Sequence, residues 1–218
     1  MTANGEKRAV GRPRRIERRQ IVDTARRILQ EEGVAALSMR RVAKEVGATP
    51  MALYHHVRDK DELLMLTLSG TAATVPRPDL PEDPRARIVA TAVHMHGVLR
   101  EMDWVVDVLG LGDLTDKGAL WMTEEIVDSC VACGLTPEQA VHAYRTIWYV
   151  VYGALVFARA EARRAADPGR RPLFASLLTP EDAGELPRLA ALADHWEETT
   201  AAYDVAEQVR KVVAGLLP

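Results

Sequence analysis

Apolar residues recur along most of this chain at the three- and four-residue intervals of helices, and no stretch alternates as a half-buried strand would. The first helix is predicted over residues 15–32 and ends at Gly33, a residue that tolerates the backbone geometry of a helix stop. Its apolar face consists of Ile21, Ala25, Ile28 and Leu29. Later helices are predicted over residues 85–102, 117–133, 137–165, 186–198 and 203–217. The pattern therefore predicts an all-α fold.

Two very short helices joined by a tight turn are predicted between residues 37 and 57. Ser38 and Thr49 are capping residues, and Pro50 suits the first helical position, where no backbone N–H is required. Gly47 ends the first of the two helices, whose apolar stripe is Val42, Ala43 and Val46. This arrangement is a helix-turn-helix, and its second helix can lie in a DNA major groove.

These residues resemble the TetR family of bacterial transcriptional regulators over residues 15–66. The resemblance rests on the helix end at 31–33, the block at 37–43, and the strings at 53–57 and 60–64. The remainder is similar, more loosely, to regulatory domains of the tetracycline-repressor type, through residues 133–137 and 215–216. The resemblance implies an N-terminal three-helix domain with the helix-turn-helix, over 15–62, and a C-terminal helical ligand-binding and dimerisation domain, over 63–218.

Charge is divided unevenly along the chain. Through Lys60 there are 14 basic residues against 7 acidic ones, whereas the remainder has 14 against 24. A basic head on an acidic body indicates that only the head meets a polyanion. Residues 1–14 are predicted to be a disordered basic arm, whose Arg12 and Arg14 are candidates for the DNA minor groove. The alternative is a solvated tail that adds only nonspecific attraction.

Candidate DNA contacts fall into two groups. The exposed face of the second short helix offers base-reading candidates, which are Thr49, Pro50, Met51, Ala52 and His55. The resemblance assigns Arg40 to a guanine and assigns Tyr54, His56 and Lys60 to phosphates, which position the protein without reading sequence. The alternative interpretation makes Tyr54 a core aromatic and His56 a surface residue.

The remaining features of the sequence indicate a linker and exclude membrane-spanning, secreted and disulfide-rich proteins. A fourth helix is predicted from Lys60 onward, and four prolines between residues 76 and 84 enforce a non-helical linker after it. The longest uncharged apolar run, residues 147–158, is too short to span a bilayer, and the basic start has no signal-peptide character. Two cysteines in 218 residues make no disulfide framework and suit a reducing cytoplasm.

The sequence offers little to catalysis or metal binding. Cys130 and Cys133 form a single C-x-x-C at the C-terminal end of a helix, the wrong end for a low thiol pKa, so core packing is the preferred interpretation. His94 and His96, two residues apart on a helix, point in different directions and cannot share a metal. No catalytic grouping or phosphate loop is present. We therefore predict neither an enzyme nor a bound cofactor or metal.

The segment 147–158 is apolar on every side and must be covered on every side. The resemblance identifies it as the family's dimer helix, which pairs with the last helix in a four-helix interface. The predicted homodimer contacts are Val151, Gly153, Leu155, Val209 and Val213.

A ligand pocket is the other role expected of the C-terminal domain. Thr91, Met95, Val98 and Met102 follow one another at i, i+4, i+7 and i+11, with His94 at the edge of that stripe. The resemblance adds facing residues from two other helices, namely Met122, Ile126, Tyr144, Trp148 and Tyr152. An adaptable lining with few polar tips favours a small hydrophobic or aromatic ligand. The alternative is that these residues pack solidly and only fill a core.

Together these features predict a sequence-specific DNA-binding regulator, most simply a repressor that a small molecule releases from a palindromic double-stranded operator. The alternative is an architectural DNA-binding protein without a sensor, which would bind any duplex equally well.

Overall fold

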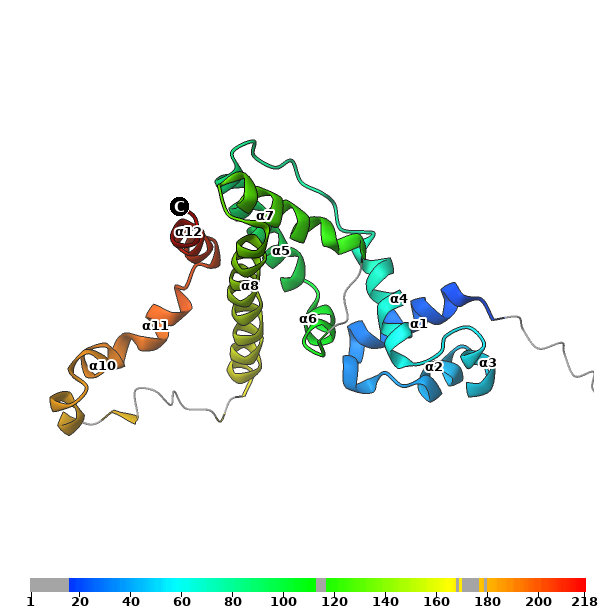
Figure 1. Cartoon of the computed structure of the whole chain (residues 1–218). Coiled ribbons are helices and arrows are strands. Elements are labelled where there is room, and N and C mark those ends of the chain that lie inside the picture. The colour runs from blue at the N-terminus through cyan, green and yellow to red at the C-terminus, as the bar shows by residue number, and fades with distance from the viewer. Residues whose placement is uncertain (1–15, 113–116, 168, 170–176, 179) are drawn as a thin grey trace, which may run out of the picture. The chain divides into compact units, whose positions relative to one another are not determined.

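The computed structural model describes residues 16–112, 117–167, 169, 177–178 and 180–218, and the regular elements within these ranges are all helical (Figure 1). This confirms the all-α prediction. The chain divides into two compact units, residues 1–70 and 71–218. The division falls inside α4 (Lys60–Ala72), later than the boundary at residue 62 expected from the sequence. The predicted arm over residues 1–14, with Arg12 and Arg14, lies outside the described residues.

The first unit is a small helical domain built from α1 (Arg18–Glu32), the 3-10 turn η1 (Val34–Ala36), α2 (Met39–Glu45), α3 (Pro50–Tyr54) and the first part of α4. The face of α1 predicted from its periodicity is the one that is buried. Its core also contains leucines and valines of the later helices, namely Leu37, Val42, Leu53, Val57, Leu63 and Leu64.

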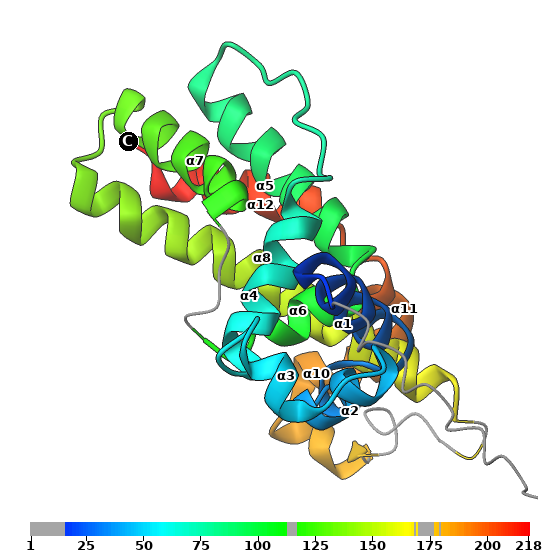
Figure 2. The same cartoon turned by 90° about the vertical axis from the view of Figure 1, so that its right-hand side faces the viewer.

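The second unit is organised around four packed helices, α5 (Pro84–Arg100), α7 (Leu120–Ala132), α8 (Pro137–Ala165) and α12 (Val205–Leu216). Helices α5, α7 and α8 pack against one another, and α12 lies along α5 and α8 (Figures 1 and 2). The start of α8 is well specified locally, because Thr136 and Gln139 form a reciprocal capping box and Pro137 occupies the first turn. The predicted bounds of α8 are confirmed.

One helix was not predicted. The helix expected over residues 85–102 ends at Arg100, and after a break at Met102 (φ −132°, ψ 68°) the chain forms α6 (Asp103–Leu109). Met102 therefore does not continue the apolar face of α5, and that part of the predicted stripe is wrong. The break has no proline or glycine signal; it allows Trp104, Val105 and Val106 to be buried, which is a tertiary effect.

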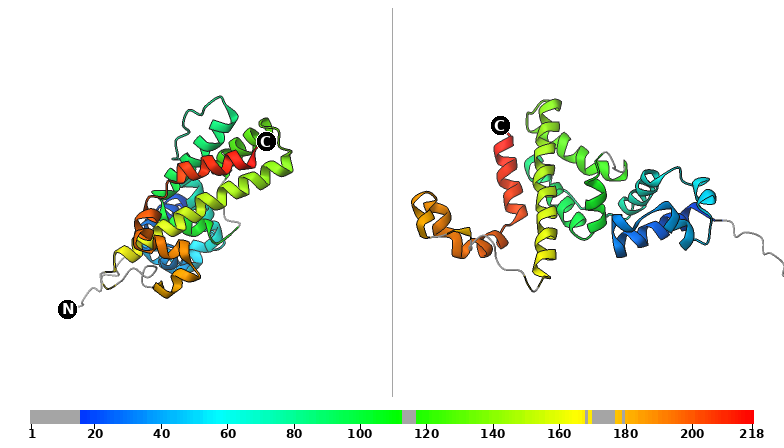
Figure 3. Two further views of the ribbon diagram at one scale, coloured as in Figure 1. Left: turned by 90° about the vertical axis from the view of Figure 1, so that its left-hand side faces the viewer. Right: turned by 90° about the horizontal axis from the view of Figure 1, so that it is seen from below.

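Residues 177–178 and 180–204 precede α12. They contain η3 (Pro180–Gly184), α10 (Pro187–Leu192), η4 (Ala193–His195) and α11 (Trp196–Ala201). Figures 1 and 3 show α10 and α11 extending away from α8 and α12. The main contacts of α10 and α11 are with η3 and η4, within the same segment. A further 3-10 turn, η2 (Lys117–Ala119), precedes α7.

Candidate functional site

The helix-turn-helix has the local structure that its capping residues predict. The Ser38 hydroxyl accepts a hydrogen bond from the Arg41 backbone N–H (3.3 Å), and the Thr49 hydroxyl accepts one from that of Ala52 (3.2 Å). Gly47 at φ +72° makes the turn between α2 and α3, a conformation that favours glycine. Both helices are thus fixed at their N-termini, which positions the outer face of α3.

The outer face of α3 is exposed. Met51 is 70% exposed and Tyr54 48%, so Tyr54 is not the core aromatic of the alternative interpretation. Ala52 and His56 are half-buried, whereas Leu53 alone of this helix is fully buried. The remaining candidates on this face are all exposed, and they are Thr49, Pro50 and His55.

Arg40 and Arg41 are neighbours in sequence with different environments. The Arg41 guanidinium donates to both carboxylate oxygens of Glu32, one at 2.6 Å, and its Nε donates to Glu45 at 3.0 Å. Arg40 is exposed and takes part in none of the ion pairs found among the described residues. Arg41 therefore joins α2 to the end of α1, while Arg40 is available to a ligand outside the protein.

Lys60 has a structural contact that the sequence did not indicate. Its ammonium group, which is half-buried, donates to the backbone carbonyl of Val34 at 3.2 Å and so ties the start of α4 to η1. An ammonium has three N–H donors, so this bond is compatible with the phosphate contact implied by the resemblance.

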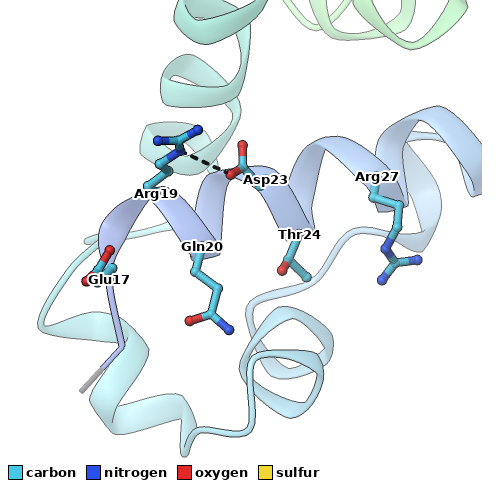
Figure 4. Close-up of a pocket in the computed structure, with 6 residues that line it drawn as sticks. All are labelled: Glu17, Arg19, Gln20, Asp23, Thr24 and Arg27. Carbon is cyan, nitrogen blue, oxygen red and sulfur yellow. Dashed lines mark ion pairs between the residues drawn. The ribbon is translucent and has the colours of Figure 1, made fainter. Parts of the chain in front are cut away.

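A shallow depression of about 430 Å³ runs along the exposed side of α1 (Figure 4). It is lined by side chains of both charges, and Arg19 forms an ion pair with Asp23 at 3.7 Å within it. The six lining residues are Glu17, Arg19, Gln20, Asp23, Thr24 and Arg27. Its mixed charge and the absence of apolar residues among these six make it unlike a site for a hydrophobic ligand.

The ion pairs between α1 and α2 make the stability of the first unit sensitive to acid. The pKa of Glu45 lies below its usual value, first because Arg41 donates a hydrogen bond to the carboxylate and also because Arg27 lies beside it; partial burial acts in the opposite direction. A carboxylate whose pKa is lowered by folding stabilises the folded state above its unfolded pKa, and this contribution is lost as the pH falls through the folded pKa.

We therefore expect the melting temperature of the first unit to fall as the pH is lowered from about 5 towards 3. Glu45→Gln should lower the melting temperature at pH 7 and flatten this pH dependence. Circular dichroism melts over the pH series measure both effects. Glu101→Gln, which removes an exposed carboxylate at the end of α5, is the control; an equal flattening in that variant would contradict the assignment to Glu45.

The interior of the second unit contains polar atoms without partners. Thr91 Oγ1 and His94 Nε2 on α5, and Ser129 Oγ on α7, are buried and have no hydrogen-bond partner among the described residues. Such atoms are costly unless something satisfies them. The centroids of the His94 and Trp121 rings lie 5.9 Å apart. The Arg77 guanidinium lies over the Trp121 ring, 5.0 Å from its centroid. The sequence did not identify Trp121, Arg77 or Ser129 as ligand candidates, because their spacing alone does not distinguish buried positions from surface positions.

The remaining ligand candidates divide between buried and half-buried positions. Thr91, Met95, Met122 and Ile126 are buried between α5, α7 and α8. Trp148 packs on Tyr152 with ring centroids 5.4 Å apart, and the Tyr152 hydroxyl donates to the Val106 carbonyl of α6 at 3.4 Å. The other half-buried candidates are His94, Val98, Met102 and Tyr144. The described contacts thus place His94 beside Trp121 at the start of α7, and they connect Trp148, through Tyr152, to α6.

The predicted dimer contacts require a correction. Val151, Leu155, Val209 and Val213 are at most 3% exposed within a single chain, because they form the packing between α8 and α12. They are therefore core residues of the single chain, although Leu155 also borders the groove on the outer side of α8. The exposed apolar face of α8 carries Tyr149, Val156 and Phe157 instead, and Gly153 lies on that outer side. A helix that is apolar all round gives no sequence signal for which face its own chain covers.

Arg159 on α8 joins that helix to α6. Its guanidinium donates to both carboxylate oxygens of Asp107 at 2.9 Å, and Asp103 lies 3.2 Å from its Nε. The pKa of Arg159 is raised, mainly by the hydrogen bonds to Asp107. This bidentate pair orients α6, the helix that holds the carbonyl bonded by Tyr152.

The described residues give no support for metal or redox chemistry. No group of three or more potential metal ligands occurs among them. Both cysteines are free thiols, and burial, with a smaller effect from Cys133, raises the pKa of Cys130 to about 11. A thiol with a raised pKa stays protonated and unreactive, which agrees with the core-packing interpretation. Burial followed by the nearby charge of Arg100 lowers the pKa of His96.

Comparison with known proteins identifies relatives of both units. Residues 21–65 match the family described as bacterial regulatory proteins, tetR family. The chain is 33% identical over 137 residues to the HTH-type transcriptional repressor DrrR1 of Streptomyces coeruleorubidus. That alignment covers 62% of this chain and 51% of DrrR1, so the chain matches only about half the length of this relative.

Three solved structures, of two proteins, extend the likeness to most of the chain. Apo ActR from Streptomyces coelicolor is 25% identical, with a TM-score of 0.69 over 94% of this chain and 96% of ActR. Its complex with actinorhodin gives a TM-score of 0.67, at 25% identity, over 92% and 96% of the two chains. BioQ bound to its natural double-stranded DNA operator is 28% identical, with a TM-score of 0.55, over 66% of this chain and 88% of BioQ. No helix among the described residues is long and apolar enough to cross a membrane.

Proposed function

Because this chain belongs to the TetR family of bacterial regulatory proteins, we propose that it is a sequence-specific DNA-binding repressor that a small hydrophobic or aromatic effector releases from its operator. The observation that carries the proposal is an exposed, capped α3 beside an exposed Arg40 at the start of α2, which forms no ion pair with any described residue. A short exposed helix and a free guanidinium are the groups that base edges in a major groove require.

The mechanism needs two copies of the chain. In a two-fold dimer, two helix-turn-helix units enter successive major grooves about 34–36 Å apart, so the operator is palindromic. An effector releases the operator only if it binds more tightly to a dimer with another spacing of the two heads. The BioQ–operator complex supports the DNA part of the proposal, and the ActR–actinorhodin complex supports a small-molecule effector.

Selection from a pool of random duplexes tests the DNA part. Enrichment of one palindromic sequence, with half-sites about one helical turn apart, is the expected result. Equal affinity for all duplexes would contradict the proposal and favour an architectural DNA-binding protein. The salt dependence of binding should be steep for both specific and random duplexes, because phosphate contacts release counterions in each case.

The proposed binding of an effector can be tested with Thr91→Val. This variant replaces the buried hydroxyl, which has no partner among the described residues, by a methyl group of the same shape. We expect the free protein to become more stable by roughly 1 kcal/mol, because an unsatisfied polar atom is removed. If an effector accepts a hydrogen bond from this hydroxyl or donates one to it, its affinity should fall about three- to tenfold.

Actinorhodin and a panel of planar aromatic compounds serve as probes, read out by quenching of tryptophan fluorescence and by thermal shift. Operator affinity without a probe should match that of the unaltered protein. A stabilised variant that binds every probe as well as the unaltered chain does would contradict a role for Thr91 in effector binding. Ser129→Ala, at the other unpaired hydroxyl further along α7, is the matched comparison.

A further inference from the structure

The linker between α4 and α5 passes over the start of α7. Its Arg77 guanidinium lies over the ring of Trp121, which belongs to the first turn of α7. Nearer to α5 the linker is held by Arg87, which donates to the backbone carbonyls of Pro81 at 2.9 Å and of Glu82 at 3.3 Å. Arg77 is therefore kept at a defined place on the surface of the second unit.

The charge of Arg77 is not neutralised by any described residue. Arg77 is exposed, and it takes part in none of the ion pairs found in the part of the chain that the structure describes. A guanidinium that contacts an aromatic ring still has five N–H donors, and these can bind a carboxylate through two parallel hydrogen bonds. The position above Trp121 is thus suited to an organic anion.

The start of α7 adds to this positive potential. Among the described residues no side chain caps this end, and its first turn contains no acidic residue. The free N–H groups and the dipole of a helix favour negative charge at its N-terminus. Lys117, exposed in the turn just before α7, is a second cation near Trp121. The acidic residues nearest in sequence, Asp79 and Glu124, form no ion pair with Arg77.

Trp121 also lies beside polar atoms of the interior that have no partner. The His94 ring contacts the Trp121 ring at an interplanar angle of 45°, and His94 Nε2 is buried without a partner among the described residues. The same is true of the hydroxyl of Thr91, a residue that lies one turn earlier on α5 and is 0% exposed. From the surface inward there are thus a cation, an aromatic ring and unsatisfied hydrogen-bonding groups.

We propose that the effector is an aromatic carboxylic acid, whose carboxylate binds Arg77 and whose ring lies beside Trp121. Hydroxyl or carbonyl groups on the ring satisfy His94 and Thr91. A neutral aromatic compound would leave Arg77 and the start of α7 without a counter-charge, and an aromatic cation would be repelled by both. This inference rests on the proposed function, because it names the class of effector that the second unit binds.

Matched pairs of an acid and its methyl ester test the charge of the ligand. Hydroxynaphthoic acid and anthraquinone carboxylic acid are each compared with their ester by isothermal titration calorimetry of the full-length protein. We expect each acid to bind about five- to tenfold more tightly than its ester, and to lower the affinity for the selected operator. Equal affinities of acid and ester would overturn the inference and leave a neutral aromatic effector in place. If neither acid binds, the inference is overturned, while selection of an operator still decides the DNA part of the proposed function.

Variants of Arg77 show whether this residue distinguishes the acid from the ester. Arg77→Leu should lower the affinity for the acid about five- to tenfold and leave that for the ester unchanged. Arg77→Lys keeps the charge without the planar fork, so part of the preference should remain. Because Arg77 is exposed, both variants should melt at the temperature of the unaltered chain.

Lys117→Met is the matched control, because it removes an equal charge four residues before Trp121. This variant should keep the preference for the acid. A preference that survives Arg77→Leu, or that is lost as completely in Lys117→Met, would overturn the assignment of the carboxylate to Arg77.

Discussion

Replacing Val151 by Glu is expected to unfold the second unit, not to separate two intact protomers. Val151 is 0% exposed within a single chain and packs in the interior formed by α8 with its neighbouring helices. A carboxylate at this fully buried position would lose its hydration, and burial of an unpaired charge is among the most destabilising of substitutions. We expect a loss of more than about 4 kcal/mol, which approaches the whole stability of a typical domain.

Phe157→Glu is the matched variant, six residues further along the same helix but 67% exposed. It should keep the helical content and melting temperature of the unaltered chain, while any change that it causes should concern self-association. Circular dichroism and chemical denaturation of the two variants give the comparison. A folded Val151→Glu monomer with an undisturbed melting curve would show that α8 turns this face outward after all.

Arg40→Ala should have the largest effect on operator recognition. Arg40 is exposed at the start of α2 and has no ion pair among the described residues, so its guanidinium is available for a base edge. We expect binding to the selected operator to weaken by about 1–3 kcal/mol, and the preference at one base pair of each half-site to relax. Binding to random duplexes should change much less, since phosphate contacts supply most of it.

Arg41→Ala is the control at the adjacent position. Because Arg41 is held by Glu32 and Glu45, this variant should lower the melting temperature of the first unit, and any operator affinity it loses should reflect stability alone. Titrations of both variants with operator and random duplexes, at a fixed salt concentration, separate the two roles. An equal loss for the two duplexes in Arg40→Ala would contradict base reading by Arg40.

The sequence alone determined the features that depend on local structure. The helix-turn-helix could be predicted because each signal acts within a few residues: Ser38 and Thr49 cap their own helices, and Gly47 makes the turn. The bounds of α8 were predicted from an unbroken helical pattern that begins at Pro137, and in the structure the capping box of Thr136 and Gln139 fixes that start locally. The buried face of α1 was predicted correctly because only one of its faces is apolar.

Other features were decided by the tertiary structure. Arg40 and Arg41 look alike in sequence, and only the positions of Glu32 and Glu45 in the folded unit show which one is engaged. The break at Met102 has no local signal, because it arises from the burial of Trp104 and its neighbours. The same applies to Thr91 and Ser129, whose hydroxyls are buried in the packed second unit and find no partner among the described residues.

The outer face of α8 is the clearest case. Its sequence is apolar on every side, so periodicity could not distinguish Val151 and Leu155, which its own chain covers, from Tyr149 and Phe157, which it leaves exposed. Which face of α8 is covered depends on where α12 packs. Residues 205–216 contact α8 although the two helices are distant in sequence. Local propensities specify helices and their ends, whereas burial is a property of the assembled fold, and it decides which apolar face remains for a partner.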